Sequence, residues 1–448
     1  MFRKKHSLIK GTLILTSAGL VSRVLGFFFR IFLSHTFGEE QVGLYQLIFP
    51  FYALCLSLST SGLETAISRS VSRFHSLGRT QDGKLIFQTG LILSVLISLI
   101  CTLLVQKNSV FLSNRFLGDP RCATLLYLIV LALPAASVHS CICGYHYGLQ
   151  RTSVPAISQL IEQFVRISSV FVLYFIFIHN GVHPEIPLAV SGIIFGELAA
   201  AGYSLFSLKK GCDADSPYIL SISKSCSELL RLSVPLTVNR TAITFLQGIE
   251  AASIPVCLEL ASHSASDALS IYGVLTGMAL PCILFPCALT NSVSLLLIPA
   301  VAQKQAESSS KETFLLIKKA AGGCFSLGLL CSVFFLLTGS FLGNFLFHSA
   351  LAGNFIITLA WICPFLYTSS ALLSAINGLG LTTLTLMINL LGLSIRILSV
   401  YFGIPHYGIT GYLWGLFISQ STVCLVALLT LSHEIKKEYL QSVESATD

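Results

Sequence analysis

Long apolar stretches alternate with short polar connections along the whole chain. A helix that crosses a bilayer needs about 20 mostly apolar residues, and twelve stretches meet that requirement. We predict spans at residues 11–34, 42–68, 85–106, 122–148, 154–178, 187–207, 230–256, 268–300, 314–337, 354–377, 383–403 and 410–432. The apolar runs are continuous and do not alternate, so a transmembrane β-barrel is not favoured. The pattern predicts an all-α polytopic membrane protein with twelve transmembrane helices.

Composition supports this class. Only 10% of the 448 residues are charged and 54% are hydrophobic, whereas soluble domains carry about 25% charged residues. That excludes a water-soluble enzyme. The net charge of +7 does not indicate a nucleic-acid partner, because the 27 Lys and Arg are sorted by topology. Nineteen lie at the termini or in alternate loops, and three (Lys107, Arg115 and Arg121) lie in the opposite loops. This bias predicts that both termini are cytoplasmic.

The longest polar connection follows the sixth span and divides the chain into two halves. We expect an N-lobe at 1–208, a cytoplasmic linker at 209–228, a C-lobe at 229–433 and a cytoplasmic tail at 434–448. A gapless shift of 230 residues aligns 134–170 with 364–400, with identity at ten of the 37 positions. Because each lobe holds an even number of spans, the two repeats are parallel. Parallel repeats are a transporter architecture in which one lobe rocks against the other.

Five arginines fall inside the predicted spans, where each costs about 2.5–3.5 kcal/mol at the bilayer centre. Their guanidinium groups fit phosphate and carboxylate oxygens bidentately. One interpretation is a polar cavity that binds an anion such as a diphosphate. The alternative is that they pair internally or extend to the lipid headgroups, and Glu162 lies at the i,i+4 distance from one of them. The candidate cavity residues are Arg23, Arg30, Arg166, Arg240 and Arg396.

Four acids also lie within spans. Glu64 and Glu250 are candidates for gating or for coupling to H⁺ or Na⁺, and Glu64 has the alternative role of pairing with an arginine. Glu197 is a further candidate for taking a proton or Na⁺. His139 and His146 stand seven residues apart on one predicted helix and are expected to be satisfied polar groups. The sequence contains no P-loop, catalytic constellation or metal-ligand spacing, so we predict no catalytic residue, metal or cofactor.

Five segments then carry a family resemblance. They read KGTLILT at 10–16, SRVLGFFFR at 22–30, GLYQLIFP at 43–50, STSG at 59–62 and TAIS at 65–68. Together they resemble the stage V sporulation protein B group. That group belongs to the multidrug/oligosaccharidyl-lipid/polysaccharide (MOP) flippase superfamily, and the 22–26 segment also resembles the first helix of the lipid II flippases.

The resemblance implies a V-shaped, MATE-like pair of six-helix lobes. It also implies a non-enzymatic flippase of polyprenyl-diphosphate-linked cell-wall precursors in the bacterial plasma membrane. The implied partners are that glycan lipid, the bilayer and cell-wall synthesis enzymes, with sporulation as one context. The first-helix arginine that meets the lipid diphosphate in those relatives corresponds to Arg23. Arg30 stands one residue beyond their second arginine, and Glu64 matches the acid near the end of their second helix.

Two alternatives stay open. A cation-coupled multidrug exporter on the same scaffold would need an acid in its cavity, but the first span holds two arginines and no acid. A membrane-embedded glycan polymerase would need a large outward loop, but the loop near 107–121 is short. The flippase is the function that the sequence favours.

Overall fold

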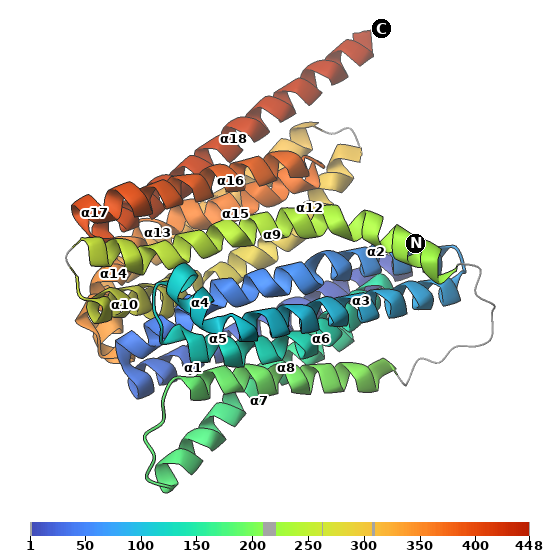
Figure 1. Ribbon diagram of the computed structural model, residues 1–448. Helices are drawn as coiled ribbons and strands as arrows, with labels where there is room; N and C mark the ends of the chain where they lie inside the picture. The colour runs from blue at the N-terminus through green and yellow to red at the C-terminus, as the bar shows by residue number, and fades with distance from the viewer. Residues whose placement is uncertain (1, 209–220, 262, 307–309, 448) are drawn as a thin grey trace. The chain divides into compact units, whose positions relative to one another are not determined.

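The computed structural model describes residues 2–208, 221–261, 263–306 and 310–447, which are helical almost throughout (Figure 1). Most of the predicted linker, residues 209–220, lies outside the described residues. The side chains of Arg3, Lys4, Lys5 and Lys10, which contribute to the topology prediction, are also outside the described part. The cytoplasmic placement of both termini therefore stays a prediction.

Contacts divide the chain into two compact units, Met1–Ala252 (unit 1) and Ser253–Asp448 (unit 2). The division falls inside one long helix, α9 (Ile222–Leu260), whose residues up to Ala252 belong to unit 1. The other helices of unit 1 are α1 (Phe2–Leu56), α2 (Gly62–Ser76), α3 (Thr80–Lys107), α4 (Ser109–Leu112), α5 (Cys122–Ile129), α6 (Leu133–Gly148), α7 (Ser153–His179) and α8 (Pro187–Leu208).

A break in α1 separates the first two predicted spans. Gly38 has φ 77° and ψ 175°, a conformation that only glycine adopts readily. Two helical stretches therefore meet at this residue. The second continues through a π-helical turn, η1 (Ser57–Ser61), into α2. A π-helical turn of this kind is often found at functional sites.

The core of unit 1 lies where α2, α3 and α6 pack against one another, side by side in Figure 1. Ile67, Phe74, Ile86 and Ile142 are almost fully buried there. Helix α7 packs mainly on α8 and α1. Much of its remaining surface is apolar and exposed, as at Phe164, as expected of a helix that faces lipid.

Unit 2 contains the end of α9 followed by α10 (Ala265–Gly273), α11 (Leu280–Leu284), α12 (Cys287–Ala306), α13 (Ser310–Phe347), α14 (Ala350–Ala360), α15 (Cys363–Gly378), α16 (Thr382–Leu398), α17 (Ile404–Tyr407) and α18 (Ile409–Thr447). Short π-helical turns join α10 to α11, at η5 (Val274–Ala279), and α16 to α17, at η6 (Ser399–Gly403). Helix α15 packs against α12, α13 and α18, and the core includes Val301, Leu372, Ile376, Val423 and Ala427.

Ten helices in the described residues are long and apolar enough to cross a membrane, or eleven if the bent pair α14 and α15 forms one span. The chain is therefore a multi-pass membrane protein, as predicted. The first of the ten, Ile14–Ser76, contains the break at Gly38. Counting its two parts separately gives eleven spans, or twelve if the bent pair is included, and the exact number stays a prediction.

The internal repeat predicted from the 230-residue shift is visible in the packing. At Gly148, an added Cβ would lie 2.8 Å from Ser68 O and 2.8 Å from the Val71 side chain. At Gly378, the equivalent glycine of unit 2, it would lie 2.8 Å from Ile298 O and 2.9 Å from the Val301 side chain. Those partners are related by the same shift. The two units therefore use glycine for the same close helix approach.

Candidate functional site

Two of the predicted cavity arginines present their side chains at the surface of apolar helices. Arg23 on α1 is exposed, and no side chain in the described part of the chain forms an ion pair or hydrogen bond with it. Arg240 on α9 is also exposed and lies close enough to Glu64 for their charges to interact. A cation without a partner in an apolar helix is costly in lipid. Arg23 therefore needs a wet or anionic environment.

Arg30 and Arg166 lie together inside unit 1. Both interact electrostatically with the buried Tyr45 on α1. Arg166 on α7 forms an ion pair with Glu162, one helical turn earlier, and both side chains are about four-fifths buried. The pairing that the sequence left open is thus present. Arg166 neutralises a buried acid, and this contact is not available to a ligand unless the pair breaks.

Small residues on α8 bring this ion pair close to the neighbouring helix. An added Cβ at Gly196 would lie 2.8 Å from Glu162 O and 3.1 Å from Arg166 Cβ. One at Gly192 would lie 2.9 Å from Arg166 O. This is the close packing that glycine pairs four residues apart permit in membrane helices. It allows Glu197, the next residue on α8, to reach the same group of side chains.

Glu197 and His139 complete a buried polar cluster across three helices. The ligand-type atoms of His139 on α6, Glu162 on α7 and Glu197 on α8 all lie within 4.8 Å of one another. His139 Nδ1 is 3.4 Å from Glu197 Oε2, and Nε2 is 2.9 Å from Ser158 Oγ. Both ring nitrogens of His139 are therefore occupied. We call His139, Glu162, Arg166 and Glu197 the unit 1 polar cluster.

The predicted gating residue Glu64 lies next to this cluster. Its carboxylate accepts a 2.8 Å hydrogen bond from Ser140 Oγ on α6. Its backbone is approached closely by Gly144, where an added Cβ would lie 2.7 Å from Glu64 O. Glu64 thus links α2 to α6 and interacts electrostatically with Arg240 and His139. The other predicted coupling acid, Glu250 on α9, is buried.

Arg396 occupies the repeat position of Arg166 in a different setting. It lines a cavity of about 230 Å³ within unit 2, together with hydroxyl and amide side chains of α15, α16 and α18. The polar lining residues are Ser369, Ser370, Asn389, Ser419 and Gln420. No acid is among the described residues that line it. The cavity is therefore a small polar pocket with one positive group, the Arg396 guanidinium.

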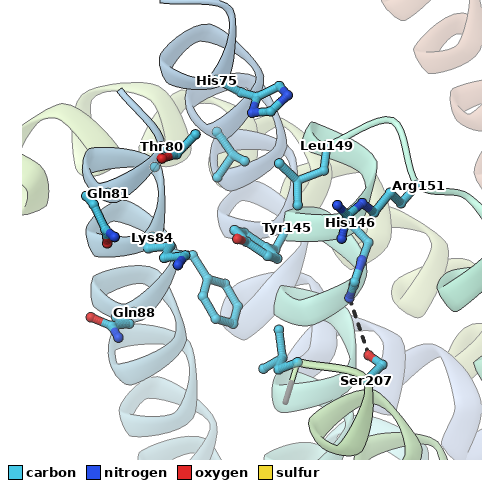
Figure 2. A pocket seen from close by; sticks show the side chains of 14 residues that line it. His75, Thr80, Gln81, Lys84, Gln88, Tyr145, His146, Leu149, Arg151 and Ser207 are labelled. Atoms are coloured by element: carbon cyan, nitrogen blue, oxygen red, sulfur yellow. Dashed lines mark hydrogen bonds between the residues drawn. The ribbon is translucent and has the colours of Figure 1, made fainter. Parts of the chain in front are cut away.

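A larger cavity of about 420 Å³ opens where α2, α6 and α8 end and α3 begins (Figure 2). Lys84 and Arg151 line it, with apolar side chains such as Phe87 and Leu149. His146 also lines it and contacts Ser207 Oγ through Nε2, at 3.3 Å. This end of the bundle carries the loops that the charge bias places in the cytoplasm. No predicted site residue lies in this cavity.

Sequence reasoning did not place His139 or Glu162 in a site. Each is visible in the sequence as a titratable residue in an apolar span, which is a general signal of function. Their meeting depends on how α6, α7 and α8 pack, and helical periodicity within one span cannot reveal that. The sequence did align Arg166 with Arg396, and it shows Glu162 one turn before the first and Gly392 one turn before the second, but it did not show that Arg396 lines a cavity.

Comparison with known proteins identifies relatives over nearly the whole chain. A profile described as "Polysaccharide biosynthesis protein" matches residues 8–303. Stage V sporulation protein B of Bacillus subtilis (strain 168) is 29% identical over 435 residues, covering 96% of this chain and 84% of the relative. Lipid II flippase MurJ of the same organism is 24% identical over 316 residues, covering 66% of this chain and 58% of the relative.

Solved structures agree on the fold. An inward-facing multidrug resistance MATE family transporter of the MOP superfamily superposes with a TM-score of 0.72 at 15% identity, covering 94% of this chain and 96% of that one. A MOP superfamily transporter from Pyrococcus furiosus gives a TM-score of 0.66 at 14% identity, with 97% and 96% covered. The MATE-like fold and the resemblance to MOP flippases are thereby confirmed. The lipid II flippase and the two solved proteins are transporters by name and not enzymes, and the chain belongs to the polysaccharide biosynthesis protein family, with the fold of the MOP-superfamily transporters.

Proposed function

We propose that this protein is a flippase for a polyprenyl-diphosphate-linked glycan. The cargo would be a lipid II-like peptidoglycan precursor or a polysaccharide repeat unit, moved across the bacterial plasma membrane by alternating access. The family and the relative named a lipid II flippase support this class of cargo. The polyprenyl tail would stay in the bilayer while the charged headgroup crosses between the lobes.

The observation that carries the proposal is the state of Arg23. It is an exposed cation on an apolar helix, and the described residues offer it no acidic partner. A diphosphate supplies the missing charge and the oxygen geometry that a guanidinium group binds. Arg240, also exposed, and Arg396, in its polar cavity, are the further candidates for this ligand. Arg166 is assigned to its ion pair with Glu162 instead.

A cation-coupled drug exporter is less well supported. It would present an acid to a cationic drug and release the drug on protonation. The acids of the unit 1 polar cluster are buried and already opposed by Arg166 and His139. Resistance to cationic drugs on expression of the protein, without movement of a lipid-linked glycan, would favour the exporter.

The direct test is flipping in proteoliposomes. A fluorescent polyprenyl-diphosphate disaccharide is placed in both leaflets, and its exposure to an external quencher is followed with time. We expect Arg23→Ala to reduce flipping to the rate of protein-free vesicles and Arg23→Lys to retain part of it. The control is Arg115→Ala, an exposed arginine in the π-helical turn Ser113–Leu117. Normal flipping by folded Arg23→Ala protein would refute this assignment.

A further inference from the structure

Two histidines on α6 make the same kind of contact through Nε2 and differ in what lies near Nδ1. His139 and His146 are separated by two helical turns, and each contacts a serine hydroxyl through Nε2. For His139 the serine is Ser158, on α7, and for His146 it is Ser207, on α8. Figure 2 shows the second of these contacts. The pair therefore provides an internal comparison for assigning protons.

In both cases the serine has no hydrogen left for the histidine. A hydroxyl carries one hydrogen. Ser158 Oγ donates its hydrogen to Pro155 O at 2.9 Å, and Ser207 Oγ donates its own to Ser204 O at 2.6 Å. Each hydroxyl must then accept from the imidazole. Both histidines consequently carry a hydrogen on Nε2, and what remains to be settled is Nδ1.

The two Nδ1 atoms have different neighbours. His146 Nδ1 is buried and has no hydrogen-bond partner in the described part of the chain, which fits a neutral ring with hydrogen on Nε2 alone. His139 Nδ1 lies 3.4 Å from Glu197 Oε2. A bare Nδ1 lone pair and a carboxylate oxygen would repel each other at this contact. One proton must lie between them, on the imidazole or on the carboxyl group.

The surrounding charges favour the same conclusion. Glu162 and Glu197 are two potential negative charges, and Arg166 balances one of them. A proton shared by His139 and Glu197 balances the other, so that the buried cluster is neutral. Loss of that proton would leave a net negative charge in a low-dielectric region, which is strongly unfavourable. The proton is therefore a structural part of the closed cluster.

Three further groups lie near His139 and Glu197. Two come from other helices, Tyr52 on α1 and Glu64 on α2, and the third is Cys143 on α6. The Tyr52 hydroxyl is buried, lies near Glu162 and Glu197, and has no hydrogen-bond partner among the described residues. The Tyr52 hydroxyl is therefore a hydrogen-bond donor that no described residue accepts from in this structure. After proton loss it can stabilise a carboxylate at the same place.

We propose that His139 and Glu197 form a proton-binding site that couples proton release to the packing of α6 against α8. With the proton present, the Nδ1 to Oε2 contact holds the two helices together. When the proton leaves to water, the lone pair and the carboxylate repel each other and the contact opens. That this step drives lipid movement rests on the proposed function. That His139 and Glu197 share a proton does not depend on the proposed function.

The first test reads protonation without transport. The full-length protein is labelled with ¹⁵N-histidine and placed in lipid nanodiscs at pH 7, and His139→Gln and His146→Gln assign the two signals. We expect His146 to give a neutral ring protonated on Nε2. His139 should give either a doubly protonated ring or a neutral ring accompanied by an infrared carboxylic-acid band that Glu197→Gln removes. Glu197→Gln should leave His139 neutral, like His146.

Two results would overturn the proposal. One is a neutral His139 in the wild type with no acid band sensitive to Glu197→Gln. The other is a shift of the His139 signal by micromolar Zn²⁺ alone, which would make the cluster a metal site. Because Glu197→Gln is nearly isosteric, its melting temperature establishes whether the variant is folded.

A second test connects the site to transport. We expect a pH gradient to stimulate flipping by the wild type. Glu197→Gln should abolish that stimulation, so that the rates with and without the gradient are equal, and should not change the Arg23-dependent flipping measured without a gradient. Stimulation that survives in Glu197→Gln overturns the coupling. Absence of any flipping by the wild type counts against the proposed function and leaves the spectroscopic result intact, so the two failures can be told apart.

Discussion

Arg166 in unit 1 and Arg396 in unit 2 occupy equivalent positions of the repeat but have different neighbours. One turn before Arg166 stands Glu162, and one turn before Arg396 stands Gly392. Near Arg166 the polar side chains are acids and a histidine, whereas those near Arg396 are hydroxyls and amides around a cavity of about 230 Å³. The same guanidinium group neutralises a buried acid in one unit and lines a polar cavity in the other.

The difference extends to other repeat positions. Glu64 accepts from Ser140 in unit 1, and the equivalent residues of unit 2, Ser294 and Ser370, place their hydroxyls 3.0 Å apart. His139 corresponds to Ser369 under the same shift. At the repeat positions of Glu64, His139 and Glu162, the titratable residue is therefore in unit 1. We infer that proton chemistry belongs to unit 1 and that unit 2 contributes a fixed positive group for an anionic ligand.

The largest expected effect is on stability when Arg166 is removed. Arg166→Ala leaves Glu162 as an uncompensated buried charge, which typically costs about 3–5 kcal/mol. Arg396→Ala removes a side chain that lines a cavity of about 230 Å³, where water can take its place, so we expect a smaller loss of stability. Thermal unfolding of both variants in the same detergent measures the contrast. Equal losses of stability would contradict the difference between Arg166, which compensates a buried acid, and Arg396, which lines a cavity.

A double substitution sharpens this comparison. Glu162→Gln with Arg166→Met removes both charges and keeps similar volumes. Replacing a buried ion pair by neutral groups is often tolerated, so the double variant should be clearly more stable than Arg166→Ala. Coupling energies between contacting residues are about 0.5–3 kcal/mol, and a double-mutant cycle would measure this one. A coupling energy near zero would show that the pair is not formed.

The close approach of α7 and α8 predicts an intermediate effect. Gly196→Ala would place Cβ 2.8 Å from Glu162 O, and overpacking of this kind costs about 1–3 kcal/mol. The matched control is Gly202→Ala on the same helix, where no atom lies within 4 Å of the added Cβ. Melting temperatures should fall for the first and stay level or rise for the second. A level result at both positions would contradict the packing of the unit 1 polar cluster.

The smallest effect is expected at an ion pair outside the membrane spans. Arg121 contacts Asp119 at 2.8 Å and Glu40 at 2.7 Å. The hydrogen bond to Asp119 is the main cause that raises the pKa of Arg121, so the stabilisation from this pair is complete at neutral pH and is lost only in strongly alkaline solution. Its side chain is 49% exposed, and such pairs contribute about 0.2–1 kcal/mol. Arg121→Ala should lower the unfolding free energy by that amount, with no change between pH 7 and 9.

Much of the fold could be predicted from the sequence because its signals are local. Apolar runs give the spans, and the identities at Arg166 and Arg396 reveal the repeat. The candidate site could be predicted only in part. The i,i+4 spacing of Glu162 and Arg166 indicates a pair, but the contact of His139 with Glu197 depends on which faces of α6 and α8 meet. Gly144 packs against Glu64 on α2 and Gly196 packs against Glu162 on α7, and no periodicity within one span encodes how that packing brings His139 to Glu197.

The central claim is that this chain has arginines for a diphosphate, Arg23 and Arg396, and an arginine for an internal acid, Arg166. Binding of farnesyl diphosphate to the purified full-length protein, compared with farnesyl monophosphate, tests it most directly. Arg23→Ala and Arg396→Ala should each lose at least tenfold in diphosphate affinity, a difference of about 1.4 kcal/mol. The Glu162→Gln, Arg166→Met double variant should bind as the wild type does. Unchanged binding by Arg23→Ala and Arg396→Ala, with loss of binding by the double variant, would contradict the account.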